Sequence, residues 1–383
     1  MLRRRSSSTN LVASLVCGVL VVLAGPTVLP AQEPGLSPAQ RTQFEAAVSK
    51  FMTANSVPGV SVALVENGDL VWSAGFGMAD LENFVPATSQ TLYRLGSISK
   101  PLTATAAMQL WERGKLDLDA PVQKYCPEFP RKKETITTRE LLGHLGGIRH
   151  YKSTAEGDRE SDNVEHFENP IAGGIKFFEN DPLVAPPGTH FHYSTQGYTL
   201  VGCAIEGASG EKYVDFMKAN VLAAAGMTHT RADDRYAIIP NRTRFYQKDK
   251  TGAVVNADFL DSSYKIPGGG WLSSAEDMAR FEVAMLRDQL MRRPTRDLMF
   301  TPLKPSDGSE DTYGLGFGRI QAAGFAEVGH TGSQQGTSTA ILIAPDKGAG
   351  VVVLINMEDI PANKLAHQLM SQILGVPDTK PDE

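Results

Sequence analysis

The amino-acid sequence predicts an α+β fold, in which an antiparallel sheet is flanked by helices and the chain carries an all-α insertion. Two observations predict it. Strand-like runs cluster toward both ends of the 383-residue chain, whereas the middle is mostly helical stretches and Gly- and Pro-rich connections. We therefore expect one compact unit, with an α/β part formed by about 39–95 and 266–383 and a helical part formed by about 96–265.

The first 31 residues are expected to be a targeting segment, and residues 32–383 the folded domain. Arg3, Arg4 and Arg5 precede an apolar run, Leu11–Ala24, that is too short to span a bilayer, so a secretory signal cleaved after Ala31 fits. A mitochondrial transit peptide and an uncleaved membrane anchor remain as alternatives. We therefore expect a secreted or periplasmic protein that contacts a membrane only if this segment is retained.

Charge and cysteine content narrow the class of protein further. The formal net charge is −6, and the first 31 residues contain three arginines and no acidic residue, so the mature chain is more acidic still. This charge argues against nucleic acid as a partner. Only Cys126 and Cys203 remain after cleavage, and the apolar surroundings of Cys203 favour a buried free thiol, although a single bridge is left open.

The N-terminal elements have clear local patterns. Residues 39–55 predict an amphipathic helix whose apolar face holds Phe44, Val48, Phe51 and Met52. Two β-rich runs follow, Gly59–Glu66 and Asp69–Phe76. They are joined by Asn67-Gly68, the pair that a two-residue type I′ hairpin turn requires.

The C-terminal end shows a second pair of strands and a helix. Thr339–Ile343 and Gly350–Asn356 flank Pro345–Gly348, and Ala362–Leu374 predicts a terminal helix. Elsewhere the sequence has four good helical stretches, at 101–114, 138–145, 196–208 and 274–288. It contains no internal repeat and no long low-complexity linker.

Ser97-Ile-Ser-Lys100 is the first candidate for a catalytic site. One helical turn separates the two side chains, so the lysine amine can lie against the hydroxyl and accept its proton. Ser97 also follows a glycine and opens a helix rich in Ala and Leu, which places the hydroxyl at the positive end of that helix. An ordinary helix cap is the alternative interpretation, and on this motif alone it is favoured over a catalytic serine.

The same Ser-x-x-Lys spacing occurs twice more in the chain. Both pairs lie among polar residues that we expect in loops, and we interpret them as coincidence: Ser209/Lys212 and Ser262/Lys265.

Tyr193-Ser-Thr195 is the second candidate element. A phenol near a cationic lysine can have a lowered pKa and act as a base toward the serine or the leaving group. A half-buried core tyrosine is the alternative interpretation.

Gly329-His-Thr-Gly-Ser333 is the third element, just before the predicted strand Thr339–Ile343. Its small residues would let a substrate pair along a strand edge and let a backbone N–H point at an oxyanion. His330 by itself could equally be a loop histidine.

In order and spacing, the three motifs together resemble the signature of the penicillin-binding protein and serine β-lactamase superfamily. Tyr193 stands where a serine is found in part of that superfamily, and His330 replaces the strand lysine. This combination is similar to the branch of class C β-lactamases, D,D-peptidases and esterases. The resemblance covers about 330 residues and implies a β-lactamase/transpeptidase-like fold.

Within that branch the chain is similar to the mitochondrial serine β-lactamase-like protein of animals and its bacterial relatives. The segments that show this likeness are Gly147–Tyr151, Tyr193–Thr195, Asn241–Tyr246, Tyr264–Gly270 and His330–Gly332. Thr195 departs from the branch, most of which has an asparagine that holds the substrate's amide. We therefore do not expect efficient turnover of β-lactams.

The resemblance also implies a role for each site residue. Ser97 attacks a carbonyl, and Lys100 and Tyr193 handle the protons. His330 and Thr331, followed by Gly332, contact the carboxylate or carbonyl side of the substrate, and Thr195 faces its amide side. The N–H groups of Ser97 and Ser333 form the oxyanion hole.

Taken together, these roles predict an exported serine hydrolase that acts through an acyl-enzyme on an ester, peptide or amide. Its partner is a small-molecule or peptide substrate, and it needs no metal and no other cofactor. The physiological substrate and the oligomeric state are not determined by the sequence.

Three other classes of protein fit the sequence less well. An α/β-hydrolase needs a Gly-x-Ser-x-Gly turn, which the chain lacks. His190-Phe-His192 suggests a metallo-hydrolase, but no further ligand motif accompanies it. A non-catalytic or weakly active protein of the same fold that binds penicillin or peptidoglycan is the strongest alternative, although all three motifs retain reactive residue types.

Overall fold

The computed structural model of the chain describes residues 35–153, 159–322 and 325–377. The predicted signal segment therefore lies outside the described residues. Among the helices that the structure describes, none is both long and apolar enough to cross a bilayer.

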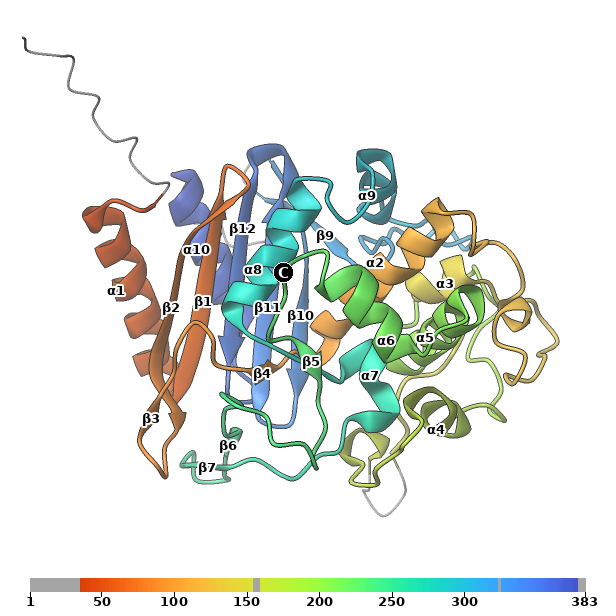
Figure 1. The fold of residues 1–383 in the computed structure, drawn as a ribbon, viewed down its shortest axis with the longest axis horizontal. Coiled ribbons are helices and arrows are strands. Elements are labelled where there is room, and N and C mark those ends of the chain that lie inside the picture. Colours follow the sequence, from red (N-terminus) through yellow and green to blue (C-terminus); the bar gives the residue numbers. More distant parts are fainter. Residues whose placement is uncertain (1–34, 154–158, 323–324, 378–383) are drawn as a thin grey trace, which may run out of the picture. The chain divides into compact units, whose positions relative to one another are not determined.

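A seven-stranded antiparallel sheet forms the centre of the fold, in the order β3-β2-β1-β12-β11-β10-β9 (Figure 1). Strands from the two ends of the chain meet in its middle, where Val60 pairs with Ile355. The strands are β1 (Gly59–Glu66), β2 (Asp69–Asp80), β3 (Val85–Pro86), β9 (Gly318–Ala322), β10 (Phe325–Gln334), β11 (Thr337–Ala344) and β12 (Ala349–Ile355). The predicted α+β class with an antiparallel sheet is confirmed.

The predicted turn between β1 and β2 is present. Asn67 and Gly68 both have positive φ, 54° and 77°, as a type I′ turn requires. At the other end, β11 and β12 are joined by the short helix η6 (Pro345–Lys347). Local turn chemistry was therefore sufficient to find both strand pairs.

Helices cover both faces of the sheet (Figure 1). On one face lie α1 (Pro38–Asn55) and α10 (Ala362–Leu374), and on the other lies α8 (Ala275–Leu286). Residues alternate along β1, so that Val60, Val62 and Leu64 pack with α1 and α10 while Ala63 and Val65 join the other core. Each face of the sheet thus has its own hydrophobic core.

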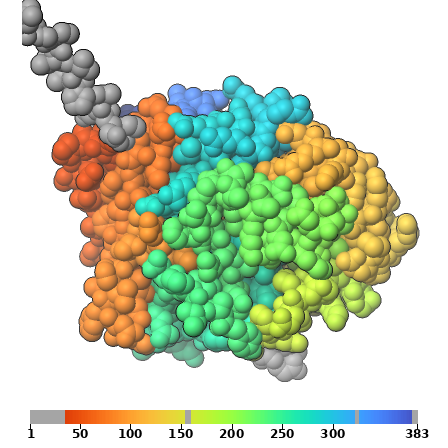
Figure 2. Space-filling model, in the orientation of Figure 1, coloured from red at the N-terminus to blue at the C-terminus, as the bar shows by residue number. Residues whose placement is uncertain are grey.

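The middle of the chain packs beside the second face, and in Figure 2 its yellow and green segments adjoin the orange and cyan ones without a break. Its centre is α2 (Ser99–Glu112), in which every residue from Ser99 to Leu110 is buried. The remaining α-helices are α3 (Thr138–Leu142), α4 (Pro170–Lys176), α5 (Thr195–Ser209), α6 (Tyr213–Met217), α7 (Ile266–Gly269) and α9 (Arg293–Met299). Shorter helical turns are η1 (Gly96–Ile98), η2 (Val122–Lys124), η3 (Glu160–Asp162), η4 (Lys218–Leu222) and η5 (Ser263–Lys265).

Outside the main sheet, the chain also contains two small sheets that the sequence did not predict. One small sheet has the order β4 (Tyr93–Arg94), β8 (Trp271–Ser273) and β5 (Arg231–Ala232), and another pairs β6 (Tyr246–Lys248) with β7 (Val254–Asn256). Runs of two or three residues are too short to show an alternating pattern, so no periodicity could have revealed them.

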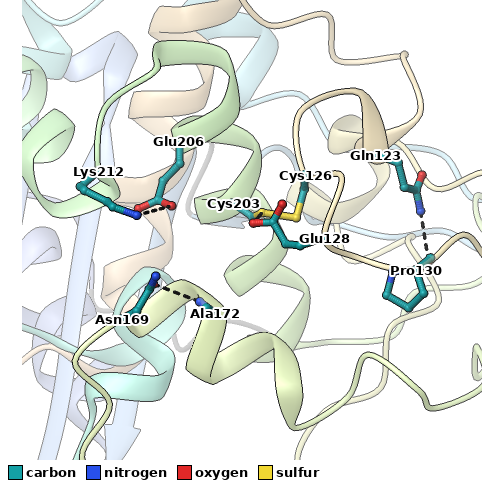
Figure 3. The surroundings of a disulfide bond; sticks show 9 residues. All are labelled: Gln123, Cys126, Glu128, Pro130, Asn169, Ala172, Cys203, Glu206 and Lys212. Carbon is teal, nitrogen blue, oxygen red and sulfur yellow. Dashed lines mark hydrogen bonds and ion pairs between the residues drawn. A yellow bond between two sulfur atoms is a disulfide. The ribbon is translucent and has the colours of Figure 1, made fainter.

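The buried free thiol favoured for Cys203 is wrong, because Cys126 and Cys203 form a disulfide (Figure 3). Both residues are buried, as the apolar sequence around Cys203 indicates. Cys203 lies on α5, and Cys126 follows η2, which packs against that helix. The pairing depends on this tertiary contact, which no local sequence pattern records.

Removing this disulfide is expected to lower the free energy of unfolding by about 3–4 kcal/mol, because a bridge that closes a long loop restricts the unfolded chain. The two cysteines are 77 positions apart. The measurement is chemical denaturation with and without a reductant. As the control, the Cys126→Ala/Cys203→Ala double variant should be insensitive to the reductant, and equal stability of reduced and oxidised wild type would contradict the expectation.

Candidate active site

The candidate nucleophile, Ser97, lies in η1 immediately before α2. Its side chain is half-buried, whereas its neighbours Gly96 and Ile98 are fully buried. The loop that holds it is fixed from two sides, since the Leu95 N–H donates to the carbonyl of Trp271 and the Leu95 carbonyl accepts from Thr339 Oγ1. Ser97 is therefore presented by a rigid turn at the start of a buried helix, as expected.

Two glycines allow β10 to approach the Ser97 turn. Gly96 has a φ of 53°, and a Cβ added there would lie 2.9 Å from the backbone N of Ser333. A Cβ at Gly332 would lie 2.0 Å from the carbonyl oxygen of Leu95. Side chains at either position would force the two segments apart, so these glycines bring the backbone of Ser333 next to the nucleophile.

Lys100 lies directly behind Ser97. Its Nζ is 3.0 Å from Ser97 Oγ, 3.1 Å from Thr195 Oγ1 and 2.8 Å from the carbonyl oxygen of Gly268. The side chain is fully buried. Burial, and then the nearby charge of Lys265, lower the pKa of Lys100 well below its usual value. A neutral amine can donate to Gly268 and Thr195 and still accept the proton of Ser97.

Tyr193 lies on the same side of the site, just before α5. The Lys100 Nζ is 4.7 Å from the centre of its ring. Burial raises the pKa of the Tyr193 phenol, and a hydrogen bond with Ser97 only partly opposes this effect. The lowered pKa expected from the sequence is therefore not found, because loss of hydration outweighs any stabilisation of the phenolate. Tyr193 stays protonated in the resting site.

Two histidines that no sequence motif singled out hold the Tyr193–Thr195 segment in place. His144 Nδ1 accepts a hydrogen bond from the Ser194 N–H at 3.1 Å, and His150 Nδ1 accepts one from the Thr195 N–H at 3.2 Å. Burial lowers the pKa of both rings, well below the usual value for His144 and to about 4 for His150. The sequence feature that could have indicated this supporting role is the presence of two histidines six positions apart, on either side of Gly146-Gly147.

His330 and Thr331 lie on β10, beyond the part of that strand that β9 covers. The pairing of β9 with β10 ends at Gly329, so beyond that residue this edge of β10 has no strand partner among the described segments, while the other edge stays paired with β11. His330 Nε2 lies 2.9 Å from the hydroxyl of Tyr313. Burial, and then Lys100, lower the pKa of His330 to about 3. The imidazole is thus neutral and adds no positive charge to the site, unlike the lysine it replaces.

A cavity of about 290 Å³ opens beside Ser97. Of the predicted residues, Ser97, Thr195 and Ser333 line it; Lys100 and Tyr193 lie behind them, and His330, Thr331 and Gly332 continue along β10. The lining also includes three residues that the sequence did not single out as functional: His150, Tyr151 and Lys265. All three lie in two of the segments that resemble the mitochondrial serine β-lactamase-like protein, Gly147–Tyr151 and Tyr264–Gly270.

The other Ser-x-x-Lys pairs differ from each other in the structure. Ser209 closes α5, with its hydroxyl on the carbonyl of Ile205, and Lys212 is exposed. Ser262 and Lys265, by contrast, are both buried, so the expectation of a polar loop is wrong for them. Lys265 lies in a helical turn of three residues, which is too short to show a periodic apolar pattern, so nothing in the local sequence indicates that it is buried.

Among the described residues, one cluster has the spacing of metal ligands: Cys126, Glu128 and Cys203. Its two sulfurs are joined in the disulfide, so they offer no thiolate (Figure 3). His190 is paired with Asp307 on the surface and does not contact the site.

Comparison with known proteins identifies the family. A family model described as beta-lactamase matches residues 44–373. The human serine beta-lactamase-like protein LACTB, mitochondrial, is 33% identical over 412 aligned residues, which cover 81% of this chain and 75% of that protein. Penicillin-binding protein 4* of Bacillus subtilis (strain 168) is 28% identical, with 84% of this chain and 75% of that protein covered.

Solved structures agree. The octameric penicillin-binding protein homologue from Pyrococcus abyssi superposes with a TM-score of 0.76 at 29% identity, covering 89% of this chain and 79% of that one. The D-amino acid amidase from Ochrobactrum anthropi SV3 shares the fold, with a TM-score of 0.74 at 21% identity over 88% of this chain and 98% of that one. With its Ser-x-x-Lys pair in contact and its fold in common with penicillin-binding proteins, the chain belongs to the beta-lactamase family.

Proposed function

We propose that this protein is an exported serine hydrolase that forms an acyl-enzyme at Ser97 and acts on an ester, peptide or amide. The observation that supports this most directly is the contact of 3.0 Å between Ser97 Oγ and the buried amine of Lys100. Burial lowers the pKa of that amine, which favours the neutral form that can accept a proton. Two hydroxyls touch the amine and line the cavity, those of Ser97 and Thr195, and Ser97 is the one that follows Gly96 beside the Ser333 backbone.

In the acylation step, Ser97 Oγ attacks the carbonyl carbon and its proton passes to the neutral Lys100 amine. The carbonyl oxygen becomes an oxyanion, which the N–H groups of Ser97 and Ser333 stabilise. The close approach of Gly96 to Ser333 supports this assignment. The tetrahedral intermediate then collapses, and the bond from carbon to the leaving oxygen or nitrogen breaks.

Tyr193 is assigned the proton transfer to the leaving group. As a protonated phenol hydrogen-bonded to Ser97, it can give its own proton to the leaving atom while it takes one from the Lys100 ammonium. Deacylation reverses these transfers, with water in place of the leaving group. The tyrosine in the second motif and the histidine in the third support a class C-like enzyme of the D,D-peptidase or esterase type.

Export is supported by the disulfide. Such bonds persist in oxidising compartments and are rare where thiols are kept reduced. The mitochondrial alternative draws its support from the animal relatives, which are described as mitochondrial. An intact disulfide in protein isolated from its native source, trapped by alkylation, would favour an oxidising compartment.

Small esters are expected to be better substrates than penicillins or cephalosporins. Thr195 has no amide N–H to give to a β-lactam's side-chain carbonyl, and its side chain is shorter than that of asparagine, with its hydroxyl 3.1 Å from the buried Lys100 Nζ. Gln196 cannot substitute, since it is fully buried and its amide contacts Glu160. An unmet polar group costs about 1–3 kcal/mol, or roughly 5- to 150-fold in kcat/KM.

The measurement is kcat/KM for nitrocefin against p-nitrophenyl butyrate, in wild type and in Thr195→Asn. The asparagine variant should gain on nitrocefin relative to the ester. Nitrocefin turnover near the diffusion limit in wild type would contradict the expectation, and an unchanged ratio in Thr195→Asn would show that another residue is responsible.

The general proposal is tested by covalent labelling with a fluorophosphonate probe, which reacts with activated serines. Mass spectrometry should locate the adduct on Ser97. A folded wild-type chain that binds a fluorescent penicillin reversibly but takes up no fluorophosphonate would instead indicate a non-catalytic binding protein.

A further inference from the structure

Lys265 is a buried cation that lines the cavity beside the nucleophile. It ends the short helix η5, and its side chain is 2% exposed. The ammonium lies over two aromatic rings, 5.4 Å from the centre of Tyr151 and 5.3 Å from that of Tyr264. Its ammonium makes no hydrogen bond or ion pair of standard geometry with any residue in 35–153, 159–322 or 325–377. Ser97 borders the same cavity.

A cation in this position is costly without an anion. Buried ammonium groups are normally paired, because the loss of hydration is not otherwise offset. Burial, and then Arg94, lower the pKa of Lys265 to about 7, with smaller opposing effects from Asp162 and Asp233. A carboxylate bound in the cavity would favour the charged form.

The two acidic residues whose charges act on the pKa of Lys265 already form ion pairs with other residues. Asp233 forms an ion pair with Arg94 at 2.9 Å, and Asp162 forms one with Arg159 at 2.9 Å. The protein therefore provides carboxylates for its other cations here and leaves the Lys265 ammonium directed at the cavity.

Lys265 lies on the side of the cavity that receives the acyl group. Tyr151, whose ring it covers, lines the cavity together with Thr195, the position that the family pattern assigns to the amide of the acyl group. A Cβ added at Gly269 would lie 3.6 Å from Lys265 Cδ and 3.8 Å from Gln334 Oε1. The lysine stem thus runs along the wall between Thr195 and the end of β10.

We propose that Lys265 binds a carboxylate on the acyl group of the substrate, so that the preferred acyl groups are those that end in a carboxylate, such as monoesters or monoamides of short dicarboxylic acids. This inference rests on the proposed function, because it requires acyl transfer to Ser97. His330 is neutral, so Lys265 supplies the positive charge that the third motif lacks. Four acidic residues also line the cavity and will limit the preference: Asp162, Asp258, Glu358 and Asp359.

The test compares p-nitrophenyl hydrogen glutarate with p-nitrophenyl pentanoate, which share a leaving group and have acyl chains of the same length. Wild type is expected to prefer the acidic ester by about tenfold or more in kcat/KM, the scale of one charge-assisted hydrogen bond. Lys265→Met, of similar length but uncharged, should remove this preference. Because the charge of Lys265 also lowers the pKa of Lys100, the quantity compared is the ratio of kcat/KM for the two esters within each protein and not the absolute rate. The Ser97→Ala variant gives the background hydrolysis of each ester.

Arg159→Met is the matched control. Arg159 also lines the cavity and is cationic, but it is largely exposed and paired with Asp162. This variant should keep the preference for the acidic ester. If Lys265→Met does not fold, the proposal is tested on wild type by inhibition of p-nitrophenyl pentanoate hydrolysis. Free glutarate should then inhibit more strongly than pentanamide, and equal inhibition would contradict the proposal.

Each other result has a definite meaning. Equal kcat/KM for the two esters in wild type overturns the assignment of Lys265 and leaves the proposed function intact. A Lys265→Met variant that loses activity equally on both esters also overturns it, and would make Lys265 a positioning residue that acts through Lys100. If wild type hydrolyses neither ester and takes up no fluorophosphonate, the proposed function fails and this inference fails with it.

Discussion

Ser97→Ala is expected to abolish ester hydrolysis, with a loss in kcat on the order of 10⁴-fold or more, because it removes the proposed nucleophile. The thermal midpoint should stay nearly unchanged, since the half-buried Ser97 hydroxyl is not part of the hydrophobic core. The measurement is the release of p-nitrophenol from a short-chain ester, with differential scanning calorimetry on the same samples. Fluorophosphonate labelling should disappear in parallel.

Ser209→Ala is the matched control for this experiment. Ser209 has the same spacing to a lysine but caps the end of α5, so its loss should leave activity at the wild-type level. Residual hydrolysis in Ser97→Ala above about one per cent of wild type would place the nucleophile at another residue.

Lys100→Ala is expected to lower kcat by about 10²-fold or more, the scale of a positioned proton-transfer group, with a smaller change in KM. The neutral amine accepts the serine proton, so activity requires the deprotonated form. Because burial lowers the pKa of Lys100 well below 10.5, wild-type kcat/KM should already be high at neutral pH and fall as acid protonates the amine. The measurement is a pH profile of both proteins.

The acid limb of that profile belongs to Lys100 if it disappears in Lys100→Ala. His150 and His330 have pKa values lowered to about 4 and about 3, so they remain neutral throughout the neutral range and cannot produce a limb there. Lys212→Ala, which removes an exposed lysine, should reproduce the wild-type profile. An unchanged limb in Lys100→Ala would assign the proton to a different group.

Features with a local cause could be predicted from the sequence. Asn67-Gly68 specified its hairpin because only a few residue types accept positive φ at both positions. The Ser97 turn and α2 were likewise visible as a glycine, a Ser-x-x-Lys pair and an apolar helix. These elements depend on residues that are neighbours in the chain, so the local sequence contains the whole pattern that specifies them.

Features that depend on distant contacts could not be predicted. Cys126 and Cys203 pair because η2 packs on α5, and His144 supports the Tyr193 segment across 50 positions of sequence. The direction of the Tyr193 pKa was also misjudged, since burial cannot be read from a motif. In each case the deciding quantity is a tertiary neighbour.

The strand order of the main sheet affects the chain while it is being made. One edge of β1 pairs with β12, so that edge has no partner, and the side chains of Val60, Val62 and Leu64 lack the cover of α10, until residues beyond Ile355 have been synthesised. At roughly 5–20 residues per second, that delay is on the order of tens of seconds, during which an apolar strand edge is open to pairing with other nascent chains. We expect the newborn chain to need a holding chaperone over this interval, and passage across a membrane in the unfolded state would postpone folding until the last strand is available.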